Sequence, residues 1–165
     1  MNDLQAPANF DPVLGKALGF NRDDLQANRV GGITDRQKTA MYGTILTNFT
    51  RYGLIGGAAL LILPALLATG SNALFVAALL VILVGGAISL PTLLYTWRLR
   101  QDWQQAKVAT VSGQVQASAA DQIQVNDQHF RLNQEVVKNF TNGETWMLYY
   151  APLSKWMLAA EKITN

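Results

Sequence analysis

Between Tyr52 and Trp97 the chain carries no Asp, Glu, Lys, Arg or His. This uncharged stretch holds two apolar runs, 54–69 and 73–97, which meet at a turn over residues 69–72. The hydrocarbon core of a bilayer is about 30 Å thick, and a helix needs about 20 apolar residues to cross it. The two runs therefore predict a transmembrane helical hairpin, with the lipid bilayer as the first expected partner.

The uncharged stretch also predicts how the chain is organised. We expect a helical segment at 1–51, the transmembrane hairpin at 52–97, a linker at 98–107 and a small β domain at 108–165. Only 15% of the residues are charged, against about 25% in a typical soluble domain. All of these charges lie outside the hairpin. The composition therefore indicates a membrane protein with water-soluble parts at both ends.

The residues that flank the hairpin predict its orientation. Basic residues precede the first run and follow the second, whereas the turn between them has no charge. Because cationic loops stay on the cytoplasmic side, we expect two spans of an inner or plasma membrane with both termini cytoplasmic. Aromatic rings beside arginines are typical of the lipid–water boundary. The expected interfacial anchors are Tyr52, Tyr95, Trp97, Arg51, Arg98 and Arg100.

The N-terminus lacks the basic region of a signal peptide, so we expect the first apolar run to remain in the protein as an anchor. Small residues recur inside both runs, and they allow helix backbones to approach closely in lipid. The candidate helix-packing positions are Gly53, Gly57, Gly85 and Gly86. Two arrangements remain open: the hairpin helices pack on each other, or the small residues face another subunit.

Three helical patterns precede the hairpin. Asp11 and Asn21 are suited to cap the first two helices, because their side chains can accept backbone N–H groups. Thr34 followed by Gln37 is the capping-box pattern, and the helix that it opens is expected to run directly into the first span. The segment 28–37 is similar to patterns in short helical bacterial modules, and it is too general to identify a family.

After the hairpin, apolar and polar residues alternate, which is typical of half-buried strands. We expect five short strands with a helical turn before the fourth, and a bulge or bend at Gly113. The predicted fold class is thus an α+β membrane protein. Its β domain is either a small barrel of SH3-like or OB-like type or an open sheet.

The last two predicted strands are apolar on both faces. The residues expected to fill the core of the β domain are Trp146, Leu148 and Tyr150. The opposite face needs cover from the N-terminal helices, the bilayer or another chain. The candidate contacts with a partner or with the membrane are Met147, Tyr149 and Met157.

No motif in the sequence points to catalysis. The absence of cysteine excludes disulfides and thiolate metal sites, and His129 is the only histidine. Gly31 and Gly32 are not followed by the lysine of a phosphate-binding loop. We therefore expect no catalytic residue, no metal site and no cofactor. A net charge of +2 without a basic run gives no reason to expect nucleic acid binding.

Two classes of function remain. The first is a membrane-anchored binding or scaffold protein, whose β domain and N-terminal helices contact a protein partner or a second copy. The second is a small accessory subunit of a larger membrane complex, which packs through the small residues of the hairpin.

Overall fold

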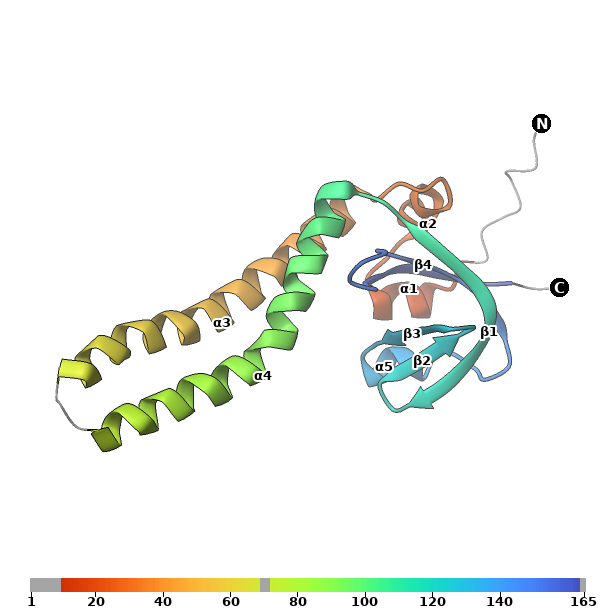
Figure 1. The fold of residues 1–165 in the computed structure, drawn as a ribbon. Coiled ribbons are helices and arrows are strands. Elements are labelled where there is room, and N and C mark those ends of the chain that lie inside the picture. Colours follow the sequence, from red (N-terminus) through yellow and green to blue (C-terminus); the bar gives the residue numbers. More distant parts are fainter. Residues whose placement is uncertain (1–9, 69–71, 164–165) are drawn as a thin grey trace.

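Two long helices extend side by side away from a head that combines short helices with a β-sheet (Figure 1). The computed structural model describes residues 10–68 and 72–163. The long helices are α3, Asp35–Ala68, and α4, Asn72–Gln105. Each has 34 residues. At 1.5 Å per residue, each is about 50 Å long, which exceeds the core thickness of a bilayer.

The head begins with two short helices, and both start at the caps that the sequence predicts. In α1, Pro12–Leu18, the carboxylate of Asp11 accepts two backbone N–H groups of the first turn. In α2, Arg22–Arg29, the side chains of Asn21 and Asp24 each accept the other residue's backbone N–H at 2.9 Å. Helices this short are marginal alone in water. Both pack against the last strand of the sheet.

The long helices continue across the boundaries expected from the sequence. As predicted, α3 runs without interruption past residue 51. The segment 98–107, expected as a linker, is helical as far as Gln105, and α4 ends just before Ala106 takes a φ of 50°. α4 changes direction along its length (Figure 1) and contains Pro91 in its interior. Proline removes a helical hydrogen bond and is a common cause of such a bend.

Five antiparallel strands form the sheet, in the spatial order β3-β2-β1-β4-β5. They are β1 (Ala109–Ala119), β2 (Gln122–Val125), β3 (Gln128–Arg131), β4 (Thr145–Tyr150) and β5 (Met157–Lys162). The predicted helical turn before the fourth strand is α5, Gln134–Val137. Because β3 and β5 are edge strands that do not pair with each other, the sheet is open. The open-sheet alternative is therefore confirmed, and the SH3-like or OB-like barrel does not form.

The first strand joins the two halves of the sheet, since β1 pairs with β4 along its first half and with β2 along its second half. A Cβ at Gly113 would lie only 2.5 Å from Oδ1 of Asn126. The Nδ2 group of Asn126 donates to the carbonyl of Ser112 at 2.8 Å. Gly113 thus leaves room for this side chain. The bulge expected at Gly113 as one of two alternatives does not form there, because Gly113 pairs in register with Trp146 and the register shift of β1 falls between Ala117 and Ala119.

One hydrophobic core joins the helices to the sheet. The fully buried residues that the helices contribute to it are Leu14 of α1, Leu25 of α2, Met41 of α3 and Leu99 of α4. The sheet contributes the side chains expected in the core, which are Trp146, Leu148 and Tyr150. The predicted helical segment and the predicted β domain therefore share a single core.

Among the described residues, the Ala73–Gln105 part of α4 is the one helix that is apolar and long enough to cross a membrane. Most of the first expected span, 54–69, has side chains that the structure does not describe. The turn at 69–71 lies outside the described residues. A hairpin with two membrane spans therefore stays a prediction.

Candidate functional site at the base of the long helices

A buried pair of amides fastens the N-terminal helices to the sheet. Asn28 Nδ2 donates to Gln37 Oε1 at 3.0 Å, and Gln37 Nε2 donates to Asn28 Oδ1 at 2.9 Å. Gln37 Nε2 also donates to the carbonyl of Leu158 in β5 at 2.9 Å. The predicted capping box is formed, because Thr34 and Gln37 bond to each other's backbone N–H at 3.2 Å. The segment 28–37 therefore has a structural role in attaching α2 and α3 to β5.

Asp24 is a second buried polar group of this attachment, with 1% of its surface exposed. Its carboxylate accepts hydrogen bonds from the Thr34 hydroxyl, the Arg36 guanidinium and the Asn21 N–H. Burial by itself would raise the pKa of Asp24. The hydrogen bonds from Arg36, Thr34 and Asn21 outweigh that effect and hold the pKa below its usual value. The charged form of Asp24 is thus favoured by the fold.

We expect Asp24→Asn to lower the free energy of unfolding by about 1–3 kcal/mol at neutral pH, because it weakens a buried, charge-assisted set of hydrogen bonds. A lowered pKa stabilises the fold above the ordinary carboxyl pKa of about 4, and this contribution is lost as the pH falls through the lower folded-state value. The difference between wild type and variant should therefore shrink below about pH 4.

Thermal unfolding in mild detergent over a pH series measures this difference. The matched control is Asp23→Asn, which changes the exposed neighbouring carboxylate. Equal losses of stability for the two variants at neutral pH would contradict the role given to Asp24.

Glu161 of β5 forms a third polar contact beneath α2. Its carboxylate accepts the Tyr149 hydroxyl at 2.5 Å and the Arg29 Nε at 3.2 Å, with a second bond from the Arg29 guanidinium. Burial raises the pKa of Tyr149, and the hydrogen bond to Glu161 raises it further. The bond to Glu161 also raises the pKa of Arg29. The contact therefore holds a neutral phenol and an ion pair between helix and sheet.

These contacts show what covers the second apolar face of the terminal hairpin. Tyr149 and Met157 are only 2% and 7% exposed, and α1 and α2 both pack on β5. Met147 is half-buried, with its sulfur 3.1 Å from the Tyr149 hydroxyl. Cover by the N-terminal helices is therefore what the structure shows. The three residues expected to contact a partner or the membrane are mostly occupied by contacts within the chain.

Three of the four candidate packing glycines have open surroundings. A Cβ at Gly53 would meet only Phe49 of its own helix, at 3.9 Å. A Cβ at Gly85 or Gly86 would meet no described atom within 4 Å. The surroundings of Gly57 lie outside the described residues. Packing of the hairpin helices on each other and a face for another subunit therefore both stay predictions.

Two of the expected interfacial anchors lie at the middle of α3, and the other four lie in the last third of α4. The Arg51 guanidinium lies 6.0 Å from the centre of the Tyr52 ring, and Trp97 is 58% exposed. The other two arginines, Arg98 and Arg100, are exposed. Tyr95 is half-buried and lines a pocket between α4 and the head. The structure thus places polar and aromatic groups together near this end of the apolar part of α4.

Asp102 connects α4 to the sheet. Its side chain is fully buried, although it lies only a few residues beyond the exposed Arg98. Its Oδ1 accepts the Leu153 N–H at 3.0 Å, and its Oδ2 accepts the Ser154 N–H at 2.7 Å. Both N–H groups belong to the turn between β4 and β5. One carboxylate therefore fixes where the turn sits against the last part of α4.

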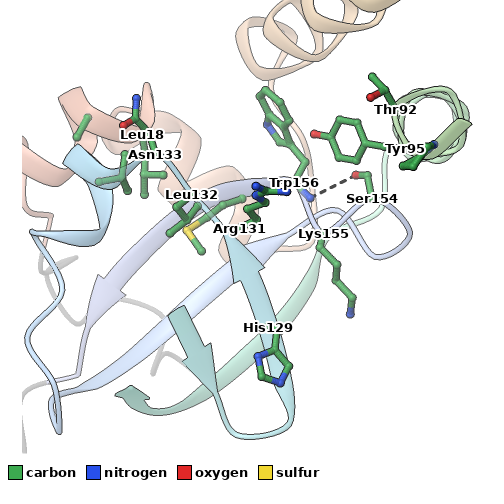
Figure 2. A pocket seen from close by; sticks show the side chains of 14 residues that line it. Leu18, Thr92, Tyr95, His129, Arg131, Leu132, Asn133, Ser154, Lys155 and Trp156 are labelled. Carbon is green, nitrogen blue, oxygen red and sulfur yellow. Dashed lines mark hydrogen bonds between the residues drawn. The ribbon is translucent and has the colours of Figure 1, made fainter. Parts of the chain in front are cut away.

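A pocket of about 630 Å³ opens beside this turn, between α4, α1 and the segment from β3 to α5. Figure 2 shows the Tyr95 ring projecting from α4 near Ser154, whose Oγ accepts the Trp156 N–H at 3.3 Å. The side chains of His129 and Lys155 lie further from the helix in this view. The described lining contains three basic side chains and no acidic one: His129, Arg131 and Lys155.

A second hollow, of about 470 Å³, lies between α3 and α4. Its walls are largely apolar and aromatic, and the rings of Tyr42 and Trp103 lie 5.9 Å apart there. More than half of the surface of Tyr42, Leu46 and Phe49 is exposed. This hollow therefore presents an apolar surface that the described part of the chain leaves uncovered.

Neither Asp102 nor the basic pocket was predicted from the sequence. Asp102 did leave a signal, because it is the single acidic residue among the basic residues that follow the second span. The pocket left none, since its residues come from elements that are far apart in the chain.

Comparison with protein-family models, with curated proteins and with solved structures found no match. Among the described residues, no group of three acidic, histidine or cysteine side chains is arranged to hold a metal ion. The candidate site therefore rests on geometry: a pocket with basic and aromatic walls beside an apolar helix.

Proposed function

We propose that the chain is a membrane-anchored binding protein, in which α3 and α4 cross the bilayer and hold the head at its cytoplasmic surface. The supporting observation is the exposed apolar surface of α4. Its large exposed residues are Leu74, Phe75, Val76, Leu79, Leu80, Leu83, Val84, Ile88, Leu90, Leu93 and Leu94. An apolar surface this extensive is unusual for a protein in water and is expected for a helix in lipid.

The attachment of the head to the helices supports a binding role rather than a loose tether. Asp102 joins α4 to the β4–β5 turn, and Gln37 joins α3 to β5. Both long helices also contribute side chains to the core of the head. These contacts hold the head in a defined position relative to α3 and α4. The exposed surface of the head therefore keeps a fixed orientation relative to the membrane anchor. We assign no catalytic role to this arrangement.

The charge asymmetry predicts that both termini face the cytoplasm. We expect a fluorescent reporter that matures only in the cytoplasm to be active when it is fused after Asn165. A reporter active only outside the cytoplasm should work when inserted at residues 69–72. Retention of the chain in the membrane pellet at alkaline pH is the control for insertion. Activity of the external reporter at Asn165 would contradict this topology.

The alternative function is that of an accessory subunit in a larger membrane complex. The hollow between α3 and α4 favours it, because the exposed Phe49 and Trp97 form a surface suited to another helix. Mass determination after purification in mild detergent separates the two functions. A fixed complex with a different chain supports the accessory subunit, whereas a monomer or homo-oligomer supports the binding protein.

A further inference from the structure

The pocket beside the β4–β5 turn has two kinds of wall. The described lining includes the basic residues His129, Arg131 and Lys155 and no acidic residue. The rest of the lining is largely apolar and includes Leu18 of α1 and Leu132, next to β3. A ligand that fills such a pocket needs an anionic part and an apolar part.

The basic side chains retain donors for an anion. Arg131 uses its Nε for a bond to Asp121 Oδ2 at 2.9 Å. A guanidinium has five N–H donors, so its terminal groups can still bind a phosphate oxygen. The Lys155 ammonium donates to Gln128 and lies 4.7 Å from the centre of the Tyr150 ring. It has three N–H donors, and one bond to an amide leaves others for an anion.

The position of the pocket on α4 indicates where that anion would come from. Pro91, Thr92 and Tyr95 form its helical wall, and the exposed Trp97 and Arg98 follow in the next turn. Tyrosine and tryptophan followed by arginine are typical of the headgroup level of a bilayer. With α4 inserted as proposed, the pocket therefore lies at the level of the lipid phosphates, next to acyl chains.

We propose that this pocket binds the headgroup of an anionic phospholipid, with Arg131 and Lys155 contacting the phosphate. The apolar wall then receives the glycerol and the first carbons of the acyl chains. This inference rests on the proposed membrane anchoring. A soluble phosphate ester shares the anionic group but not the apolar part, and the test below separates the two ligands.

The test uses the full chain in mild detergent, titrated with phosphatidylglycerol or with phosphatidylcholine, with bound lipid measured by native mass spectrometry. We expect retention of phosphatidylglycerol in preference to phosphatidylcholine. The variant Arg131→Gln/Lys155→Gln should bind phosphatidylglycerol about thirtyfold more weakly, since each of the two basic groups contributes about 1 kcal/mol near a lipid surface. The matched control is Lys107→Gln/Lys138→Gln, which removes the same charge at exposed positions outside the pocket.

Three results would overturn the inference. They are equal binding of the two lipids, an equal loss in the two double variants, and binding of soluble glycerophosphoglycerol as tight as that of the intact lipid. Flotation of the chain with vesicles distinguishes this failure from failure of the proposed function. If the chain floats with vesicles but does not prefer phosphatidylglycerol, the lipid site is wrong and the membrane anchoring stands. If the chain does not float with vesicles of either lipid, both the anchoring and the lipid site are wrong.

Discussion

Replacing Trp146 with alanine is expected to lower the free energy of unfolding by about 3–5 kcal/mol, the usual cost of emptying the space of a buried tryptophan. Trp146 lies on β4 with 2% of its surface exposed. Its ring packs edge-on against that of Phe140, with the two ring centres 4.9 Å apart. This loss should be a large fraction of the total stability, because a small domain has only a few kcal/mol of stability in all and the head shares one core with the long helices. Thermal unfolding of the full chain in mild detergent, followed by circular dichroism, measures it.

Two companion variants show whether packing is the cause. The indole N–H of Trp146 is buried without a hydrogen-bond partner among the described residues. Trp146→Phe removes this donor and keeps most of the ring, so it should retain more stability than Trp146→Ala. Trp97→Ala deletes the same side chain where it is exposed and should change stability by about 0.5 kcal/mol or less. A larger loss at Trp97 than at Trp146 would contradict the buried position of Trp146 and the exposed position of Trp97.

Local features of the fold could be predicted because each depends on neighbours in sequence. The caps at Asp11 and Asn21 and the capping box at Thr34 need only residues two or three positions away. The alternation of apolar and polar residues likewise predicted five strands and which side of β4 carries Trp146 into the core.

The remaining features depend on residues that are distant in sequence. Gln37 reaches the carbonyl of Leu158, and Arg29 reaches Glu161. The sequence around Gln37 or Arg29 does not indicate which distant residue the side chain contacts. It therefore left open whether the N-terminal helices, the bilayer or another chain covers β5. The same reason explains why barrel closure was undecided. Whether the edge strands β3 and β5 meet is set by the twist of the whole sheet rather than by any one strand.

The basic pocket shows this limit most clearly. Arg131 and Lys155 are more than twenty positions apart, and nothing in the residues around either one indicates the other. Only the fold brings them into the lining of one pocket. Asp102 differs, because a single acidic residue among the basic residues that follow the second apolar run is a visible exception. Its partners are backbone N–H groups, which have no signature in the sequence.

The second large effect is expected at Asp102. Replacing it with alanine removes the acceptors of the Leu153 and Ser154 N–H groups. An unsatisfied buried donor costs about 1–3 kcal/mol, and the Ser154 N–H is buried whereas the Leu153 bond is only partly buried, so the free energy of unfolding should fall by about 2–4 kcal/mol. Because these bonds join α4 to the β4–β5 turn, the turn should also open more often. Hydrogen exchange at Leu153 and Ser154, measured beside thermal unfolding, should become faster even where the chain remains folded.

A graded set of variants tests whether Asp102 acts as an acceptor of both bonds. Asp102→Asn keeps one oxygen acceptor and presents an NH₂ group to the other donor, so its loss of stability should fall between wild type and Asp102→Ala. Asp121→Ala removes a carboxylate of the same size from an exposed ion pair with Arg131 and should cost no more than about 1 kcal/mol. Unchanged exchange at Leu153 and Ser154 in Asp102→Ala would mean that the helix and the sheet are held together by the shared core alone.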